Sequence, residues 1–383
     1  MKVALVHDWL TGMRGGERCL EAFCELYPDA DIYTLIHTPG TVSETIEKHR
    51  IKTSFIERLP KSKQCYRHYL PLFPKAIASF DLTGYDLILS SSHCVAKGVS
   101  VPKGICHIAY LHTPMRYIWD QYEVYFNKET ASYAVRTAMK MVRAYLQHWD
   151  VDSNRDIYAF IANSSYVAAR IERYYHRKAD VIYPPVDFER FSVSPPHDSF
   201  YLMVTALVPY KRVDLAIIAF NQLKLPLKII GFGPDAGRLK ALAGPTIAFL
   251  GEQSDADVGL AYGRCRALIF PGEEDFGIVP LEAMASGKPV IAYGRGGALE
   301  TIIALDVSHD GASPTGLFFF EQTPKAICDA ILYFEEYKDK FDPVRIREHI
   351  RLFDKEQFKK KMRQYITKTV QRFNEDNRAK AAS

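Results

Sequence analysis

The chain has 383 residues, 48% hydrophobic and 25% charged, and its 49 Lys and Arg against 45 Asp and Glu give a formal net charge of +4. This is the composition of a soluble globular protein, which excludes a disordered chain, a collagen-like chain and a disulfide scaffold, and the length suggests two or three domains. The nearly balanced charge gives no support to a nucleic-acid partner, because nucleic-acid-binding domains are usually strongly basic.

The cysteines and apolar runs bear on where the protein works. Seven cysteines without a C-x-x-C pair favour a reducing compartment over a zinc site or a disulfide framework. The N-terminal apolar run, Val3 to Val6, is too short for a signal peptide. No stretch of about 18 apolar residues exists, so no membrane-spanning helix is expected. We therefore expect a cytoplasmic protein, with peripheral attachment to the inner face of the cell membrane left open.

In chain order, the first half alternates apolar strands with helices. Strands are predicted at 2–6, 87–89, 105–111 and 157–162, and helices at 16–27 and 131–147. The second helix is amphipathic. Its predicted apolar face consists of Val135, Ala138, Met139, Val142 and Leu146, and its polar face of Arg136, Lys140, Arg143 and Gln147.

Two adjacent prolines, Pro184 and Pro185, mark a domain boundary, because they hold the backbone extended. A second proline-rich stretch follows at 194–199. The pattern then restarts, and the predicted elements of the second half are strands at 200–205, 227–230, 267–270 and 290–293 and helices at 214–223, from Pro280 and after Gly297. Such alternation predicts parallel α/β sheets with helices on both faces.

The predicted organisation is therefore α/β, with one doubly wound, Rossmann-like domain at 1–185 and a second at 186–354. The charged stretch that starts at Lys355 predicts a C-terminal helix within 355–383. No strand follows this helix, so packing back on the N-terminal domain is one option for it.

An acidic, amide-rich turn precedes the helix predicted at Pro280. Backbone amides at a helix N-terminus attract anions, and this turn supplies those of Phe276, Gly277, Ile278 and Val279. Glu274 and Glu282 lie at its two ends. Each acid alone would be a solvated side chain or a partner of the helix dipole. Together with the amides they favour a ligand with phosphate and hydroxyl groups, because carboxylates accept hydrogen bonds from hydroxyls.

Two adjacent cations, Lys211 and Arg212, follow the first strand of the second half. Such a pair is usually only solvated surface. Here it lies at the carboxyl end of a strand, where open α/β sheets bind their ligands. The two cations could neutralise a diphosphate without a divalent metal. We therefore expect neither a metal nor a cofactor.

The chain resembles glycosyltransferase family 4, the retaining GT-B enzymes. The resemblance lies in Glu274 and Glu282 with seven residues between them, and in the segments Gly15-Gly16-Glu17, 111–117, 209–212, Gly231-Phe232-Gly233, Phe249-Leu250-Gly251 and 285–290. It covers nearly the whole chain and implies two Rossmann-like domains that face a central cleft. Among family members, the chain is most similar to bacterial GDP-mannose-dependent mannosyltransferases of surface polysaccharide assembly.

The resemblance implies roles in the second domain. Lys211 and Arg212 would hold the donor's diphosphate, Glu274 would contact the transferred sugar and Glu282 the ribose. The remaining donor contacts would come from Gly231 and from the amides of Phe276, Gly277, Ile278 and Val279. Many members have an arginine where this chain has Ala206, so more of the phosphate contact would fall to Arg212.

In the first domain, the resemblance implies that Gly15 and Gly16 let the backbone approach the donor. His112 would lie beside the transferred sugar and, with Glu274, form the catalytic pair. A histidine after a strand is often only a structural hydrogen-bonding group. Its place at the carboxyl end of strand 105–111 favours the functional interpretation.

The positive charge of the first half is concentrated at 48–75, which holds eight Lys and Arg against one Glu. Many such runs are only solvated faces. The interleaved aromatic residues also suit an anionic membrane surface, where each Lys or Arg contributes about 1 kcal/mol. The residues expected at this membrane or acceptor surface are Lys52, Arg58, Lys61, Lys63, Arg67, Lys75, Arg136, Lys140 and Arg143.

The expected function is transfer of a hexose, most simply mannose from GDP-mannose, to a lipid-linked oligosaccharide in O-antigen or exopolysaccharide synthesis. Two alternatives stay open. A GT-B nucleotide-sugar epimerase would need no lipid-facing surface. A non-catalytic protein that binds sugar nucleotides would not need both carboxylates and both cations.

Overall fold

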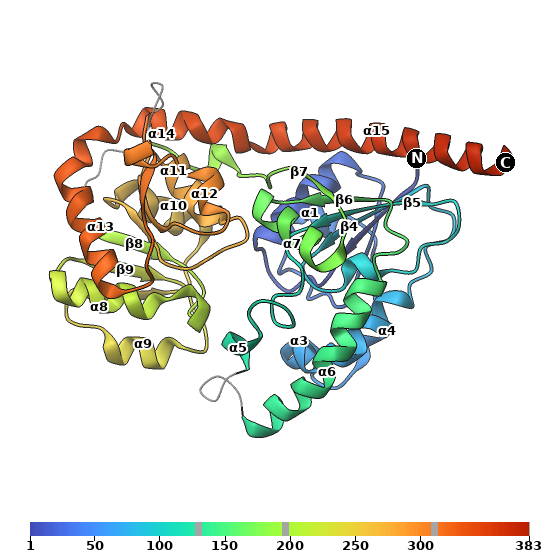
Figure 1. Cartoon of the computed structure of the whole chain (residues 1–383), viewed down its shortest axis with the longest axis horizontal. Helices are drawn as coiled ribbons and strands as arrows, with labels where there is room; N and C mark the ends of the chain where they lie inside the picture. The colour runs from blue at the N-terminus through green and yellow to red at the C-terminus, as the bar shows by residue number, and fades with distance from the viewer. Residues whose placement is uncertain (127–131, 194–198, 308–312, 383) are drawn as a thin grey trace. The chain divides into compact units, whose positions relative to one another are not determined.

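The computed structural model describes residues 1–126, 132–193, 199–307 and 313–382 (Figure 1). The chain divides into two compact units: unit 1 comprises Met1–Pro185 and Glu356–Ser383, and unit 2 comprises Val186–Lys355. The division falls directly after the two prolines. Most of the second proline-rich stretch, residues 194–198, lies outside the described residues.

Unit 1 is built on a parallel sheet with the strand order β3-β2-β1-β4-β5-β6-β7. Its strands are β1 (Val3–His7), β2 (Asp31–Thr34), β3 (Ile51–Thr53), β4 (Leu87–Ser92), β5 (Cys106–Leu111), β6 (Ala159–Ala162) and β7 (Ala179–Val181). Successive side chains of a strand point to opposite faces of the sheet. In β1 and β4 the side chains on both faces are buried. Leu5 and Leu89 face one hydrophobic cluster, and Ala4 and Ile88 face the other.

Helices cover both faces of this sheet (Figure 1). The helices of unit 1 are α1 (Gly15–Leu26), α2 (Glu44–Glu47), α3 (Ser62–Cys65), α4 (Phe73–Ala78), α5 (Tyr122–Tyr125), α6 (Tyr133–Asp152), α7 (Ser165–Tyr175) and α15 (Lys355–Ala382). A short 3-10 helix, η3 (Ala96–Gly98), follows β4. None of the described helices is long and apolar enough to cross a membrane.

Unit 2 has a second parallel sheet, with the order β10-β9-β8-β11-β12-β13. Its strands are β8 (Tyr201–Val204), β9 (Leu227–Ile230), β10 (Ile247–Gly251), β11 (Leu268–Phe270), β12 (Val290–Tyr293) and β13 (Gly316–Phe319). Its helices are α8 (Val213–Leu223), α9 (Ala236–Leu242), α10 (Asp255–Arg264), α11 (Ile278–Ala285), α12 (Ala298–Thr301), α13 (Pro324–Tyr337) and α14 (Pro343–Ile350). The predicted fold class, two Rossmann-like α/β sheets, is confirmed.

Two local predictions were wrong. α11 begins at Ile278 instead of Pro280, which is possible because the first N–H groups of a helix have no intrahelical partner for proline to remove. In α6, Val135 of the predicted buried face is 46% exposed. Arg143 and Gln147 of the predicted polar face instead donate hydrogen bonds to the carbonyl oxygen of Ile118.

The C-terminal helix α15 is part of the core of unit 1. Phe358, Met362 and Ile366, spaced by one helical turn, are at most 2% exposed. The ring of Phe358 lies 5.6 Å from that of Phe23 in α1 and 5.8 Å from that of Tyr110 in β5. The last helix therefore completes the core that the first strands and α1 begin.

Replacing Phe358 by alanine is expected to lower the free energy of unfolding of unit 1 by about 3–5 kcal/mol, because it removes a buried ring and leaves a cavity. Urea unfolding followed by tryptophan fluorescence measures the change. Lys361→Ala, at an exposed position of the same helix, is the control and should change little. Equal effects of the two substitutions would show that α15 does not belong to the core.

Candidate active site

In both units several predicted site residues follow the two strands at the topological switch point of the sheet, as Lys211, Glu274 and Gly15 do. In unit 2 the chain runs outward from β8 to β9 on one side and from β11 to β12 on the other. In unit 1 the corresponding neighbours are β1 and β4. Loops that leave adjacent strands in opposite directions open a crevice at their carboxyl ends, where α/β sheets bind ligands.

Across the switch point of unit 2, Lys211 and Glu274 meet. Lys211 follows β8 and Glu274 follows β11, and the Lys211 ammonium donates to the Glu274 carboxylate. Next to it, Arg212 has the left-handed φ of +52° and lies 3.3 Å from Asp214. The two predicted phosphate ligands therefore each have a carboxylate partner that a bound anion would have to displace.

Glycines bring the loops of unit 2 together. Gly231, with φ +133°, approaches the backbone so closely that a Cβ there would lie 1.9 Å from the carbonyl oxygen of Thr205. A Cβ on Gly296 would lie 2.2 Å from the carbonyl oxygen of Glu274, and Gly297 N–H donates to that oxygen at 2.9 Å. Only glycine fits such contacts, so Gly296 and Gly297 set the position of the Glu274 backbone.

The helix α11 starts beside these loops. Gly277 is its N-cap, with φ +86°, and the predicted amides of Phe276, Gly277, Ile278 and Val279 form its N-terminal turn. Glu282, further along α11, accepts a hydrogen bond of 3.0 Å from the hydroxyl of Tyr262. Burial and the Glu282 charge both raise the pKa of Tyr262, so this hydroxyl stays a donor and orients the carboxylate.

In unit 1, a buried carboxylate organises the switch point. Asp8, fully buried at the end of β1, accepts hydrogen bonds of 2.6–3.0 Å from the four consecutive backbone amides of residues 93–96, which follow β4. Its carboxylate also lies 3.1 Å from Nδ1 of His93. Burial nevertheless lowers the pKa of His93.

His112 lies at the same edge, in contact with Gly16. A Cβ on Gly16 would lie 3.3 Å from the ring of His7 and 3.7 Å from Nε2 of His112, so glycine lets the start of α1 pack against both rings. Nε2 of His112 lies 2.8 Å from Oγ of Ser91. Burial, with His93 and His7 nearby, lowers the pKa of His112 well below its usual value, which favours a neutral imidazole.

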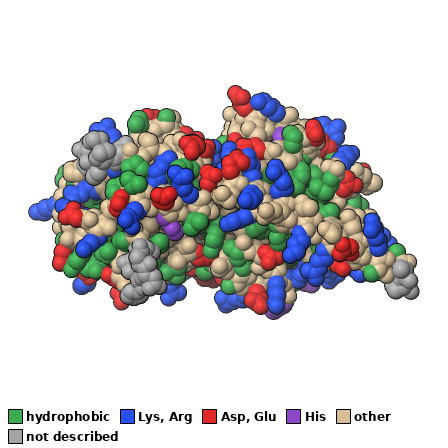
Figure 2. Space-filling model, turned by 90° about the horizontal axis from the view of Figure 1, so that it is seen from above, with side chains coloured by type: hydrophobic (Ala, Val, Ile, Leu, Met, Phe, Trp, Pro, Cys, Tyr) green, Lys and Arg blue, Asp and Glu red, His purple; other side chains and the backbone are tan. Residues whose placement is uncertain are grey.

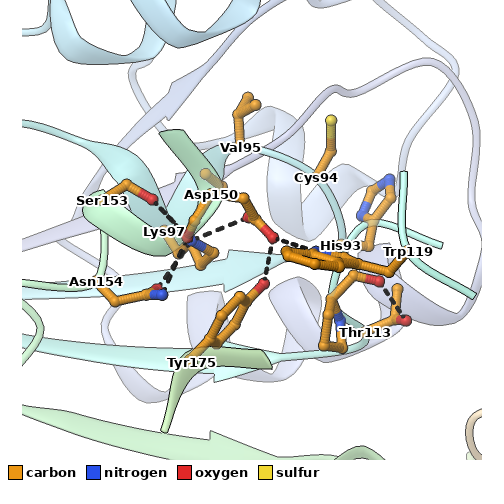
Figure 3. Close-up of polar contacts among 12 residues, drawn as sticks. His93, Cys94, Val95, Lys97, Thr113, Trp119, Asp150, Ser153, Asn154 and Tyr175 are labelled. Carbon is orange, nitrogen blue, oxygen red and sulfur yellow. Dashed lines mark hydrogen bonds and ion pairs between the residues drawn. The ribbon is translucent and has the colours of Figure 1, made fainter. Parts of the chain in front are cut away.

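The loop that follows His112 is held by a buried ion pair (Figure 3). The ammonium of Lys97, 1% exposed, lies 3.1 Å from the carboxylate of Asp150 and donates to Asn154. Asp150 in turn accepts hydrogen bonds of 2.8 Å from Trp119 in the loop and from Tyr175 in α7. Burial lowers the pKa of Lys97, and only its polar neighbours keep a charge there tolerable.

The predicted basic surface is partly corrected. Lys52 is not a free surface cation, because it lies 3.2 Å from Asp31 and donates to Tyr33. Arg143 is half-buried, with its guanidinium over the ring of Tyr122 at 4.2 Å. Arg136 is also half-buried. The predicted residues whose side chains are exposed are Arg58, Lys61, Lys63, Arg67, Lys75 and Lys140.

Several polar residues at or near this edge were not predicted: His7, Asp8, Ser91, Lys97 and Asp150. His7 and Asp8 directly follow the first apolar run. Polar residues at the end of a predicted strand indicate a site at the carboxyl edge of the sheet, so these two could have been predicted. Ser91 is separated from His7 by 84 positions, and no local pattern connects them. Each unit therefore carries its own set of site residues at its own sheet edge.

Two family models match the chain. Residues 13–190 match the model described as Glycosyltransferase Family 4, and residues 186–351 match the model described as Glycosyl transferases group 1. Their border coincides with the division between the two units.

Curated relatives are similar over shorter regions. The chain is 40% identical over 101 residues to a GDP-mannose-dependent alpha-mannosyltransferase of Mycolicibacterium smegmatis, and the matched region covers 26% of each chain. It is 30% identical over 102 residues to O-antigen chain mannosyltransferase C of Escherichia coli, covering 25% of this chain and 28% of that one. The matches span less than half the length of these relatives.

Among solved structures, HepE of Anabaena in complex with UDP is similar to the chain as a whole. The TM-score is 0.68 at 17% identity, with 96% of this chain and 100% of that chain covered. At this identity the similarity is one of fold, and the fold is GT-B.

Asp150→Asn is expected to lower the free energy of unfolding by about 3–5 kcal/mol, because it leaves the buried Lys97 ammonium without its counter-charge. Chemical denaturation measures the loss. Asp152→Asn, on the same helix but 38% exposed in its side chain, is the control and should cost at most about 1 kcal/mol. Similar losses for both would mean that the buried pair does not hold this part of unit 1.

Proposed function

The chain belongs to the glycosyltransferases, with a family 4 domain in unit 1 and a group 1 domain in unit 2, and from this premise we propose that it is a retaining mannosyltransferase. The donor is GDP-mannose and the acceptor a lipid-linked oligosaccharide of O-antigen or exopolysaccharide synthesis. The observation that carries the proposal is the meeting of Lys211 and Glu274 across the switch point of unit 2.

The arrangement in unit 2 suits a nucleoside diphosphate sugar. A donor diphosphate would compete with Glu274 for the Lys211 ammonium and with Asp214 for Arg212. Glu274 would then accept hydrogen bonds from hydroxyls of the sugar, and Glu282, oriented by Tyr262, from those of the ribose. When the diphosphate replaces the two carboxylates at Lys211 and Arg212, it is bound by these cations, and the same replacement lets Glu274 orient the sugar.

Transfer requires stabilisation of a cationic sugar and of the departing diphosphate. Lys211, Arg212 and the amides at the start of α11 are placed for the developing negative charge. In retaining transfer the leaving phosphate oxygen can take the proton of the acceptor hydroxyl on the same face of the sugar. No residue then has to act as a strong base, in keeping with the lowered pKa of His112.

Mannose and guanosine are proposed from the relatives. The mycobacterial relative is named for GDP-mannose and the Escherichia coli relative for mannose transfer to the O-antigen chain. Both names describe those proteins, and their similarity to this chain covers about a quarter of it.

A lipid-linked acceptor is proposed from the surface of unit 1 at α3, α4 and α6 (Figure 1), of which α4 and α6 share one hydrophobic cluster. Here the exposed cations Arg58, Lys61, Lys63, Arg67 and Lys75 are joined by exposed apolar side chains. Tyr133 and Met141 of α6 are 78% and 73% exposed, and Leu72 is 41% exposed. On the face shown in Figure 2, by contrast, basic and acidic side chains are interspersed. Exposed cations and exposed apolar groups on the same unit suit an anionic membrane surface.

Lys211→Ala is expected to reduce kcat for transfer of mannose from GDP-mannose about 10²–10³-fold, because one donor to the developing diphosphate charge is lost. The assay follows donor consumption with a membrane extract as the acceptor source, and a panel of nucleotide sugars tests the choice of donor. Lys338→Ala, 50% exposed in its side chain at the end of α13, is the control. Unchanged turnover in Lys211→Ala would contradict the proposal that Lys211 binds the diphosphate. If the wild-type protein consumes no donor, the proposed function is wrong.

The triple variant Lys61→Gln, Lys63→Gln, Arg67→Gln is expected to bind anionic vesicles about 10²-fold more weakly, because each cation contributes about 1 kcal/mol. Flotation with vesicles of phosphatidylcholine, with or without phosphatidylglycerol, measures binding. The matched control replaces Lys360, Lys361 and Lys368, which are exposed on α15. Equal recovery of the wild-type protein with both vesicle types would exclude electrostatic attachment.

A further inference from the structure

A line of polar side chains connects Glu17 to His112 behind the carboxyl edge of unit 1. Oε1 of Glu17 lies 3.7 Å from Nε2 of His7. Nδ1 of His7 lies 3.1 Å from Oγ of Ser91, which lies 2.8 Å from Nε2 of His112. His7 and Ser91 are fully buried and Glu17 is 2% exposed. The chemistry of His112 is therefore coupled to a carboxylate on α1 through groups that solvent does not reach.

Glu17 determines the direction of the hydrogen bonds along this line. Interaction with His7 lowers the pKa of Glu17 despite its burial, so Glu17 is ionised and can only accept. Nε2 of His7 faces this carboxylate and has no hydrogen-bond partner among the described residues. A lone pair at this nitrogen would be held against a negative charge, so the His7 proton is on Nε2.

The other carboxylate near His7 does not compete for its ring. Asp8 is occupied by the four backbone amides of residues 93–96 and faces His93. In the form of His7 that carries one proton, on Nε2, Nδ1 accepts the hydrogen bond from the Ser91 hydroxyl. The Ser91 oxygen is left to accept from Nε2–H of His112.

We propose that Glu17, His7 and Ser91 are positioning residues that hold His112 as the Nε2–H tautomer, so that its Nδ1 presents a lone pair to the ligand. His112 is half-buried. Among the described residues, the hydrogen bond of its ring is made by Nε2. An Nδ1 lone pair accepts from a hydroxyl and repels phosphate or carbonyl oxygens. His112 thus selects a sugar hydroxyl over the diphosphate. This last step rests on the proposed function, whereas the tautomer does not.

The test is long-range ¹H–¹⁵N NMR of the full-length protein, labelled with ¹⁵N-histidine and measured without ligand at neutral pH. The spectrum of His112→Gln identifies the His112 signals. In the wild-type protein, Nε2 of His112 should have the shift of a protonated nitrogen and Nδ1 that of an unprotonated one. Ser91→Ala breaks the line and Glu17→Gln removes the charge that directs it, so in both the two shifts of His112 should move towards each other.

Ser92→Ala is the matched control, because the Ser92 hydroxyl is buried on the same strand without a hydrogen-bond partner among the described residues. It should leave the His112 shifts unchanged. A protonated Nδ1 in the wild-type protein, or wild-type shifts in both Ser91→Ala and Glu17→Gln, would overturn the proposal. Thermal unfolding of each variant verifies that it is folded.

Turnover gives a second readout. Loss of the fixed tautomer in Ser91→Ala should lower kcat about tenfold, the worth of one hydrogen bond to the reacting ligand, while Ser92→Ala keeps wild-type kcat. A wild-type kcat in Ser91→Ala would overturn the role in positioning. If the wild-type protein consumes no sugar nucleotide, the proposed function fails, and the NMR result still decides the tautomer.

Discussion

The carboxylate of Asp8 is the interaction on which the carboxyl edge of unit 1 depends. A buried carboxylate only accepts hydrogen bonds, and Asp8 satisfies this with four consecutive backbone amides. It thereby fixes the turn after β4 relative to the end of β1. Residues of this turn then lead to two parts of the site. His93 leads to the histidines of the site, and Lys97, one residue beyond the bonded amides, leads to Asp150 and the loop after β5.

The two units fix the residues at the carboxyl edges of their sheets in different ways. Unit 1 holds its edge with buried polar side chains, whose removal leaves unpaired groups in a region of low dielectric. Unit 2 holds its edge with glycines that let loop backbones touch, as Gly296 does at Glu274. Its charged side chains, Lys211 and Glu274, remain paired with each other. In unit 2, close backbone contacts combined with ion pairs that an anion can replace suit the proposed binding of a donor. In unit 1, the buried polar side chains suit the orientation of the His112 imidazole.

Strand ends were predicted best for β9 and β12. Both were predicted with their observed ends, because each is a short, largely apolar run between turns. The short edge strands β3 and β7 were missed, because their residues are only partly buried and show no apolar pattern. The inward face of α6 was misassigned because Arg143 and Gln147 bind the Ile118 carbonyl, and hydrophobic periodicity does not register polar packing.

The sequence by itself determined the fold class, the division at Pro185 and the proximity of candidate site residues that lie within one short segment, such as Glu274 and Glu282. Residues on one turn and helix are neighbours whatever the rest of the chain does. Only the tertiary structure decided that His7, Ser91 and His112 meet, because their contact requires β1 beside β4 and β4 beside β5. The order of strands in a parallel sheet depends on how helices pack across both faces, a property of the whole unit that no local pattern encodes.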